Sequence, residues 1–192
     1  MESGIIVYNI NKMKILSYML VCLLCCVGLS AQQASDVKAD ENGYIVYEGQ
    51  TCPDFSITLT DGRTLRMSEL KGKVVMLQFT ASWCSVCRKE MPFIEKDIWQ
   101  RYKEHPDFVL LGVDRDEPLD KVIQFGKQVG VTYPLGLDPG AEIFARFALK
   151  KAGITRNVLV DRDGKIIMRT RLYKEDEFQS LVETIGKTLD KQ

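Results

Sequence analysis

The chain has 192 residues, 45% of them hydrophobic, and its 26 lysines and arginines match its 26 aspartates and glutamates in number. This length and apolar content suffice for one globular domain with an ordinary core. The balanced charge argues against a protein that binds nucleic acid or an anionic membrane through a basic surface.

Residues 1–31 are predicted to form a secretory signal peptide. The apolar run Ile15–Leu29 follows two lysines and is too short to span a bilayer comfortably. A start at the second methionine would leave residues 1–12 upstream of the translated protein. Lipidation at Cys26 is an alternative anchor, disfavoured because Cys25 replaces the small residue usual before a lipidated cysteine. We therefore expect the mature protein in the periplasm or cell envelope.

The mature chain keeps three of the six cysteines, namely Cys52, Cys84 and Cys87. Three cysteines are too few for a disulfide scaffold but suffice for one redox pair and one additional thiol. For Cys52 two interpretations stay open. It is either a buried residue that packs like an alanine or an auxiliary thiol that traps reaction intermediates.

The folded domain is expected to span residues 49–192. Residues 32–48 are polar with little periodicity, which predicts a flexible tether between the export signal and the domain. The domain opens with alternating apolar and polar residues on either side of Asp61 and Gly62. This pattern predicts a β-hairpin with its turn at the Asp-Gly pair.

The rest of the chain alternates between apolar runs of strand length and amphipathic helical repeats. Strands are expected at residues 73–79, 108–114, 133–138, 157–161 and 165–171, and helices at residues 87–102, 119–130, 141–149 and 174–190. Strands that alternate with helices predict a parallel-rich sheet with helices on both faces, closed by an antiparallel pair at one side. The expected fold is a three-layer α/β sandwich.

Cys84 and Cys87 lie at the expected junction between a strand and a helix. A zinc site needs about four ligands, and the mature chain adds only one further cysteine and His105, which is in a turn. A bridge between positions 84 and 87 closes too short a loop to be an effective structural staple. The helix N-terminus favours a thiolate at Cys84, and Cys87 can then attack a mixed disulfide. Redox exchange, without a metal or cofactor, is the favoured chemistry.

Three segments resemble thioredoxin-fold proteins of the TlpA/ResA type, within the redoxin superfamily. "GKVVMLQFTASWCSVCRKEMP" resembles their active-site signature, "CPDFSITLTDGRTLRMSELKG" their hairpin lead-in, and "VLVDRDGKII" their C-terminal strand and turn. The resemblance covers roughly residues 49–185. It implies a thioredoxin-like α/β/α sandwich with an N-terminal β-hairpin extension, and an exported thiol-disulfide oxidoreductase that acts on protein thiols.

The resemblance also assigns roles to individual residues. Cys84 matches the attacking cysteine, Cys87 the resolving cysteine, and Trp83 the aromatic residue on the rim of the active site. Glu90 matches an acidic residue of the family and is expected to accept and return protons, with an exposed helix charge as the alternative. Pro92 is expected to kink the helix.

Two positions depart from the family pattern. Gln78 stands where thioredoxin has a buried aspartate, and it is expected to satisfy a buried polar contact. Thr155 stands where the family has a cis-proline; a cis bond before a non-proline residue costs about 2.5 to 4 kcal/mol, so we expect a trans bond. Ile154, Thr155 and Arg156 are nevertheless expected to line the substrate groove opposite Cys84.

Together these expectations describe a monomeric enzyme that reduces protein disulfides and contributes to redox homeostasis. A membrane thiol protein would supply its electrons, and apocytochrome or other envelope proteins would be its substrates. The first alternative is a peroxiredoxin-like thiol peroxidase with antioxidant activity, although Leu77 and Ala81 occupy its motif positions and Thr80 is one residue out of register. The second alternative is a non-catalytic thioredoxin-fold binding module.

Overall fold

The computed structural model of the chain describes residues 38–191. The expected signal peptide, residues 1–31, and most of the expected tether lie outside the described residues. Within residues 38–191, none of the helices combines the length and the hydrophobicity needed to span a bilayer.

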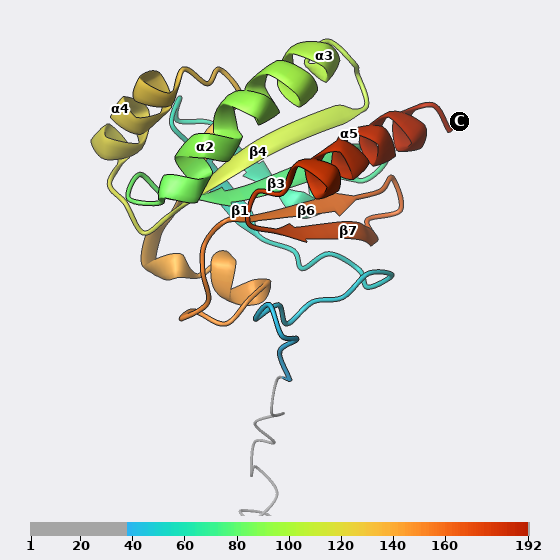
Figure 1. The fold of residues 1–192 in the computed structure, drawn as a ribbon, viewed down its shortest axis with the longest axis horizontal. Coiled ribbons are helices and arrows are strands. Elements are labelled where there is room, and N and C mark those ends of the chain that lie inside the picture. Colours follow the sequence, from blue (N-terminus) through green and yellow to red (C-terminus); the bar gives the residue numbers. More distant parts are fainter. Residues whose placement is uncertain (1–37, 192) are drawn as a thin grey trace, which may run out of the picture. The chain divides into compact units, whose positions relative to one another are not determined.

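A seven-stranded mixed sheet forms the centre of the domain, in the spatial order β2-β1-β5-β4-β3-β6-β7. Its neighbouring strands β4, β3, β6 and β7 can be followed in Figure 1. The strands are β1 (Ser56–Leu59), β2 (Thr64–Arg66), β3 (Val74–Thr80), β4 (Phe108–Arg115), β5 (Leu135–Asp138), β6 (Arg156–Val160) and β7 (Ile166–Arg171). Strands β3, β4 and β5 are parallel, whereas β6, β7 and the β1–β2 hairpin are antiparallel to their neighbours. The thioredoxin-like α/β fold, the hairpin and the closing antiparallel pair are therefore confirmed.

The long helices cover one face of this sheet (Figure 1). They are α2 (Ser85–Phe93), which continues through the π-helical segment η2 (Ile94–Trp99) into α3 (Gln100–Tyr102), and then α4 (Leu119–Val129) and α5 (Glu175–Leu189). The Arg88 guanidinium of α2 lies over the Phe125 ring of α4, and Phe93 of α2 contacts Phe178 of α5. These contacts join the three helices into one layer.

The opposite face carries no long helix in the described part of the chain, so the helix expected at residues 141–149 was a wrong prediction. Short 3-10 segments stand there, η3 (Pro139–Ala141) and η4 (Phe144–Arg146), while η1 (Met67–Leu70) follows the hairpin. Gly140 and Ala141 have positive φ values, so a continuous helix cannot run through them. The Phe144 and Phe147 rings still bury themselves against Phe79 of β3. Burial of the aromatic residues thus does not require a regular helix.

Pro92 makes the active-site helix irregular rather than ending it. Proline has no backbone N–H and cannot donate to the carbonyl one turn earlier. Immediately afterwards the helix widens into the π-helical η2, at whose end the N–H of Gln100 donates to the carbonyl of Glu95, five residues earlier. The irregularity expected at Pro92 therefore takes the form of a π-helical segment.

The folded part of the chain extends N-terminal to the expected boundary at residue 49. Tyr44 and Val46, in the expected tether, are both only 3% exposed. The Tyr44 hydroxyl donates to the Thr170 carbonyl at 2.7 Å and also lies 3.2 Å from the Asn157 carbonyl. The apolar residues of this segment reach the sheet because burying them and pairing the hydroxyl offset the cost of ordering the chain.

The buried Tyr44 hydroxyl yields a stability prediction. Replacing Tyr44 by phenylalanine should lower the free energy of unfolding by about 1 to 2 kcal/mol, because buried carbonyls lose their donor. Urea denaturation measures this change. Tyr47→Phe is the matched control, since Tyr47 is 66% exposed and should change stability negligibly. Equal stabilities of the two variants would contradict the inferred role of Tyr44.

Candidate active site

The candidate active site lies where β3 ends and α2 begins. Cys84 is the N-cap residue of α2, with extended backbone angles, and its Sγ accepts a hydrogen bond from the N–H of Cys87 at 3.1 Å. The sulfur thus takes the place of a usual capping oxygen. The unpaired N–H groups and the dipole at this end of the helix favour negative charge on Cys84.

Cys84 and Cys87 form a disulfide with a Cα–Cα distance of 5.3 Å. Cys84 is 7% exposed, whereas Cys87 is completely buried. A reagent or a substrate sulfur arriving from solvent therefore meets Cys84 first, and Cys87 can react only inside the site. This asymmetry is what an attacking cysteine and a resolving cysteine require.

Thr155 brings a hydroxyl group to both sulfurs. Its peptide bond with Ile154 is trans, as expected, since residues 38–191 contain no cis peptide bond. Thr155 Oγ1 lies 3.2 Å from Cys84 Sγ and 3.4 Å from Cys87 Sγ, and the residue is only 2% exposed. The position opposite the disulfide is therefore occupied as expected, but by a side chain that can donate a hydrogen bond to it.

The other residues expected in the substrate groove differ in accessibility. Trp83 is 61% exposed beside Cys84, while the Ile154 side chain is buried. Arg156 is completely buried; its guanidinium lies 4.2 Å from the centre of the Tyr44 ring and donates to the carbonyls of Gly153 and Asn42. The expectation that the Arg156 side chain lines the groove is therefore wrong, because Tyr44 and the backbone provide its contacts in the interior.

Glu90 is buried one turn after Cys87. It is 2% exposed, which contradicts the alternative of an exposed helix charge, and its Oε1 accepts a hydrogen bond from Asn157 Nδ2 at 2.7 Å. Within the described residues its other oxygen has no hydrogen-bond partner. Burial raises the pKa of Glu90 to about 7, and the hydrogen bond from Asn157 opposes that rise. A carboxyl group with this pKa can take up and release a proton near neutral pH.

Gln78 satisfies a buried polar contact, as expected. It is completely buried, and its Oε1 accepts a hydrogen bond from the Tyr133 hydroxyl at 2.6 Å. A neutral amide does not titrate, so Gln78 cannot act as a base. Glu90 is consequently the buried carboxyl group that the active-site helix contributes.

Glu117, two residues after β4, belongs to the site although no sequence motif marks it. Its carboxylate accepts hydrogen bonds from the N–H of Ser82 at 2.5 Å and from Ser82 Oγ at 2.7 Å, and Lys121 Nζ lies 2.5 Å away. Glu117 thereby holds the segment that leads into Cys84. The available signal was an acidic residue just after β4, whose end lies beside the end of β3. Burial and the Glu117 charge raise the pKa of Asp114, the last-but-one residue of β4, to about 8.

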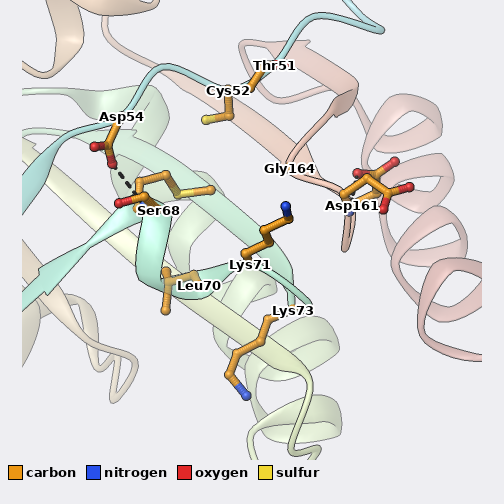
Figure 2. A pocket seen from close by; sticks show the side chains of 11 residues that line it. Thr51, Cys52, Asp54, Ser68, Leu70, Lys71, Lys73, Asp161 and Gly164 are labelled. Atoms are coloured by element: carbon orange, nitrogen blue, oxygen red, sulfur yellow. Dashed lines mark hydrogen bonds between the residues drawn. The ribbon is translucent and has the colours of Figure 1, made fainter.

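Cys52 lies at the other end of the sheet, beside a cavity of about 240 Å³ (Figure 2). Its N–H donates to the carbonyl of Gly164, in the turn after β6, whereas Thr155 precedes the start of β6. The residue is 8% exposed, and burial raises the pKa of its thiol to about 12. Cys52 is thus a protonated, buried thiol remote from the disulfide, which favours the alanine-like interpretation.

Peroxiredoxins resemble one another in a motif threonine and in an arginine that stabilises the thiolate and the peroxide. The residues of this chain considered for these two roles, Thr80 and Arg156, make other contacts. The Thr80 hydroxyl is buried and donates to Met91 Sδ at 3.4 Å. The Arg156 guanidinium faces Tyr44 and backbone carbonyls. This arrangement favours disulfide exchange over peroxide reduction at Cys84.

Comparison with known proteins points to the same chemistry. Residues 47–185 match the Redoxin family. The thiol-disulfide oxidoreductase ResA of Bacillus thuringiensis subsp. konkukian is 29% identical over 163 residues, which cover 84% of this chain and 90% of the relative. A solution structure from Bacteroides thetaiotaomicron, provisionally described as a protein disulfide isomerase, is 67% identical with a TM-score of 0.76 over 78% of this chain and 94% of that one. A Chlorobium tepidum crystal structure, provisionally described as the thiol:disulfide interchange protein DsbE, is 26% identical with a TM-score of 0.66 over 75% and 99% of the two chains.

The raised pKa of Glu90 predicts a specific pH dependence of stability. Below its ordinary pKa of 4.5 the carboxyl is protonated in both the folded and the unfolded protein. Between pH 4.5 and about 7 only the folded protein keeps the proton, so its stability falls as the pH rises and then levels off. The total loss from this group is about 3 kcal/mol.

Glu90→Gln should remove this contribution. Chemical denaturation of the oxidised protein at several pH values measures the difference in unfolding free energy between wild type and variant. This difference should shift in favour of the variant between pH 4.5 and 7. The exposed Glu104→Gln variant is the control and should follow the wild-type profile. A pH-independent difference for Glu90→Gln would show that Glu90 does not hold a proton in the folded state.

Proposed function

The chain belongs to the Redoxin family and is a thiol-disulfide oxidoreductase, and we propose that it reduces protein disulfides in the cell envelope by exchange through Cys84 and Cys87. One observation carries the proposal. The disulfide lies at the N-terminus of a helix, and Cys84 is 7% exposed whereas Cys87 is completely buried. This arrangement supports attack by one cysteine and resolution by the other.

The reaction proceeds in two exchange steps. In the reduced protein the Cys84 thiolate attacks a substrate disulfide, forms a mixed disulfide and releases one substrate thiolate. Cys87, as a thiolate, then attacks Cys84 Sγ, which forms the internal disulfide and releases the second substrate thiolate. The protein loses two electrons and two protons, and the substrate gains both as two thiols.

Glu90 is assigned to proton transfer during the second step. Cys87 is buried and must lose its proton before it can attack Cys84. Glu90 is also buried, one helical turn away, with a pKa near 7 that allows it to accept a proton and return it. Gln78 and Asn157, which lie beside Glu90, are neutral amides and cannot accept the proton. We therefore assign this role to Glu90 alone.

The substrate is proposed to be an unfolded or extended protein segment. Trp83 is the exposed aromatic residue beside Cys84, and the backbone at Ile154 and Thr155 lies on the other side. An aromatic side chain can contact many different peptides, so the site does not need a deep pocket. Apocytochrome and other envelope proteins with disulfides are the proposed substrates.

The expected signal peptide supports export, and we propose that the exported enzyme is a monomer that receives its electrons from a membrane thiol protein. Each turnover leaves the Cys84–Cys87 disulfide oxidised, so a dithiol donor must reduce it again. In an oxidising compartment this supply cannot come from a soluble thiol pool. A membrane protein that transfers electrons across the membrane to the envelope could reduce the Cys84–Cys87 disulfide after each turnover.

Disulfide reduction can be tested with insulin. The purified mature protein should accelerate the dithiothreitol-dependent reduction of insulin, and Cys84→Ser should lower the rate to the uncatalysed level because the attacking sulfur is lost. Cys52→Ser is the matched control and should retain wild-type activity, since Cys52 is buried far from the pair. An active Cys84→Ser variant would rule out the proposed exchange, and rapid consumption of hydrogen peroxide without insulin reduction would favour a peroxidase.

Substrates can be captured with Cys87→Ala. This variant should accumulate mixed disulfides through Cys84, because the resolving sulfur is absent. Affinity purification without reductant, followed by mass spectrometry, should identify envelope proteins that are released by dithiothreitol. The double variant Cys84→Ser/Cys87→Ala should capture none of them. Partners that bind the double variant equally well would instead indicate a non-catalytic binding module.

A further inference from the structure

The hydroxyl of Thr155 lies within hydrogen-bond distance of both active-site sulfurs. Thr155 Oγ1 is 3.2 Å from Cys84 Sγ and 3.4 Å from Cys87 Sγ. Both distances are within hydrogen-bond range for sulfur. Because Thr155 is 2% exposed, bulk water cannot readily replace its hydroxyl. A proline at this position would provide no donor of any kind.

The threonine loop is held in place by the end of β7. The carbonyl of Thr155 accepts hydrogen bonds from the N–H of Leu172 at 3.2 Å and from Arg171 Nη1 at 3.3 Å. Its neighbour Arg156 is anchored in the interior against Tyr44. The hydroxyl therefore keeps its position while its O–H bond stays free to rotate.

A hydroxyl group has one proton to donate and two lone pairs with which to accept. In the oxidised protein both sulfurs are neutral and are weak acceptors. After reduction a thiolate is a far stronger acceptor, because hydrogen bonds to charged groups are shorter and stronger. The proton of Thr155 will consequently be directed to whichever sulfur carries the negative charge.

We propose that Thr155 is a catalytic residue whose hydroxyl stabilises first the Cys84 thiolate and then the Cys87 thiolate during exchange. In the reduced protein Thr155 O–H donates to Cys84 S⁻ and accepts from Cys87 S–H, while the N–H of Cys87 gives Cys84 a second donor. Once Cys84 is bonded to the substrate sulfur, the hydroxyl turns to Cys87 S⁻. No bond to Thr155 is made or broken.

This inference rests on the proposed function and adds a side chain that stabilises the reduced form of the site. When Cys87 attacks Cys84 Sγ, its electron pair forms the Cys84–Cys87 bond and the substrate sulfur leaves as a thiolate. The Cys87 proton has gone to a neighbouring base, and the leaving thiolate takes up a proton from solvent. The hydroxyl lowers the energy of the charged sulfur on the protein before each attack.

The test compares Thr155→Val with Thr155→Ser in the mature protein. Valine retains nearly the same shape without the hydroxyl, and serine retains the hydroxyl. For Thr155→Val the pH midpoint of thiolate formation at Cys84, followed by alkylation rates, should rise by about one unit. The equilibrium with glutathione should shift about tenfold toward the disulfide, which corresponds to a reduction potential about 30 mV more negative.

Thr155→Ser should restore values close to wild type in both measurements. Unchanged midpoint and potential in a folded Thr155→Val protein would overturn the inference, as would equal shifts in both variants, because packing and not the hydroxyl would then be responsible. Neither measurement involves a protein substrate. A wild type that fails to reduce insulin would therefore refute the proposed function without deciding the role of Thr155.

Discussion

The hydrogen bond from the N–H of Cys87 to Cys84 Sγ is the interaction on which the active site depends. It makes a sulfur the cap of helix α2, so the reactive atom lies at the positive end of the helix. Strand β3, buried along its whole length, fixes where that helix begins. Position and electrostatics of the attacking sulfur thus follow from one junction between a strand and a helix.

Next to this junction lies a group of buried, hydrogen-bonded polar side chains, where ionisation of a carboxyl group is energetically unfavourable. Glu90 contacts Asn157, which also donates to Thr170 Oγ1 at 2.9 Å, while Gln78 pairs with Tyr133. In such surroundings an ionised carboxylate is costly, and this cost raises the pKa of Glu90 toward neutrality. The same burial that makes the group useful for proton transfer lowers the stability of the protein once the group ionises.

The segments around the site are fixed by contacts between distant parts of the chain. Glu117, after β4, holds Ser82, and the end of β7 holds Thr155. Arg156 completes the arrangement by turning inward to Tyr44, which belongs to the N-terminal segment. The disulfide thus lies between a segment held by the residue after β4 and a loop held by the end of β7. Trp83 is the exposed side chain next to it.

The helix expected at residues 141–149 shows where local pattern fails. Its apolar residues do recur with helical spacing, and they are buried. However, the Asp138 carboxylate accepts the N–H groups of Ile143 and Phe144 at 2.7 and 2.8 Å, and Gly140 takes a left-handed conformation. These contacts stabilise separate turns. Periodicity predicts which side chains are buried, but not whether the backbone that carries them forms one regular helix.

The sequence by itself determined the order of the strands and of the long helices, the hairpin, and the placement of Cys84 and Cys87 at a strand-to-helix junction. These features depend on short-range periodicity, turn residues and spacing, which are local properties of the chain. Only the tertiary structure decided that Tyr44 belongs to the domain, that Arg156 points inward, and that the Thr155 hydroxyl meets both sulfurs. Those outcomes depend on contacts between residues far apart in the chain, and such contacts leave no periodic signal in the sequence.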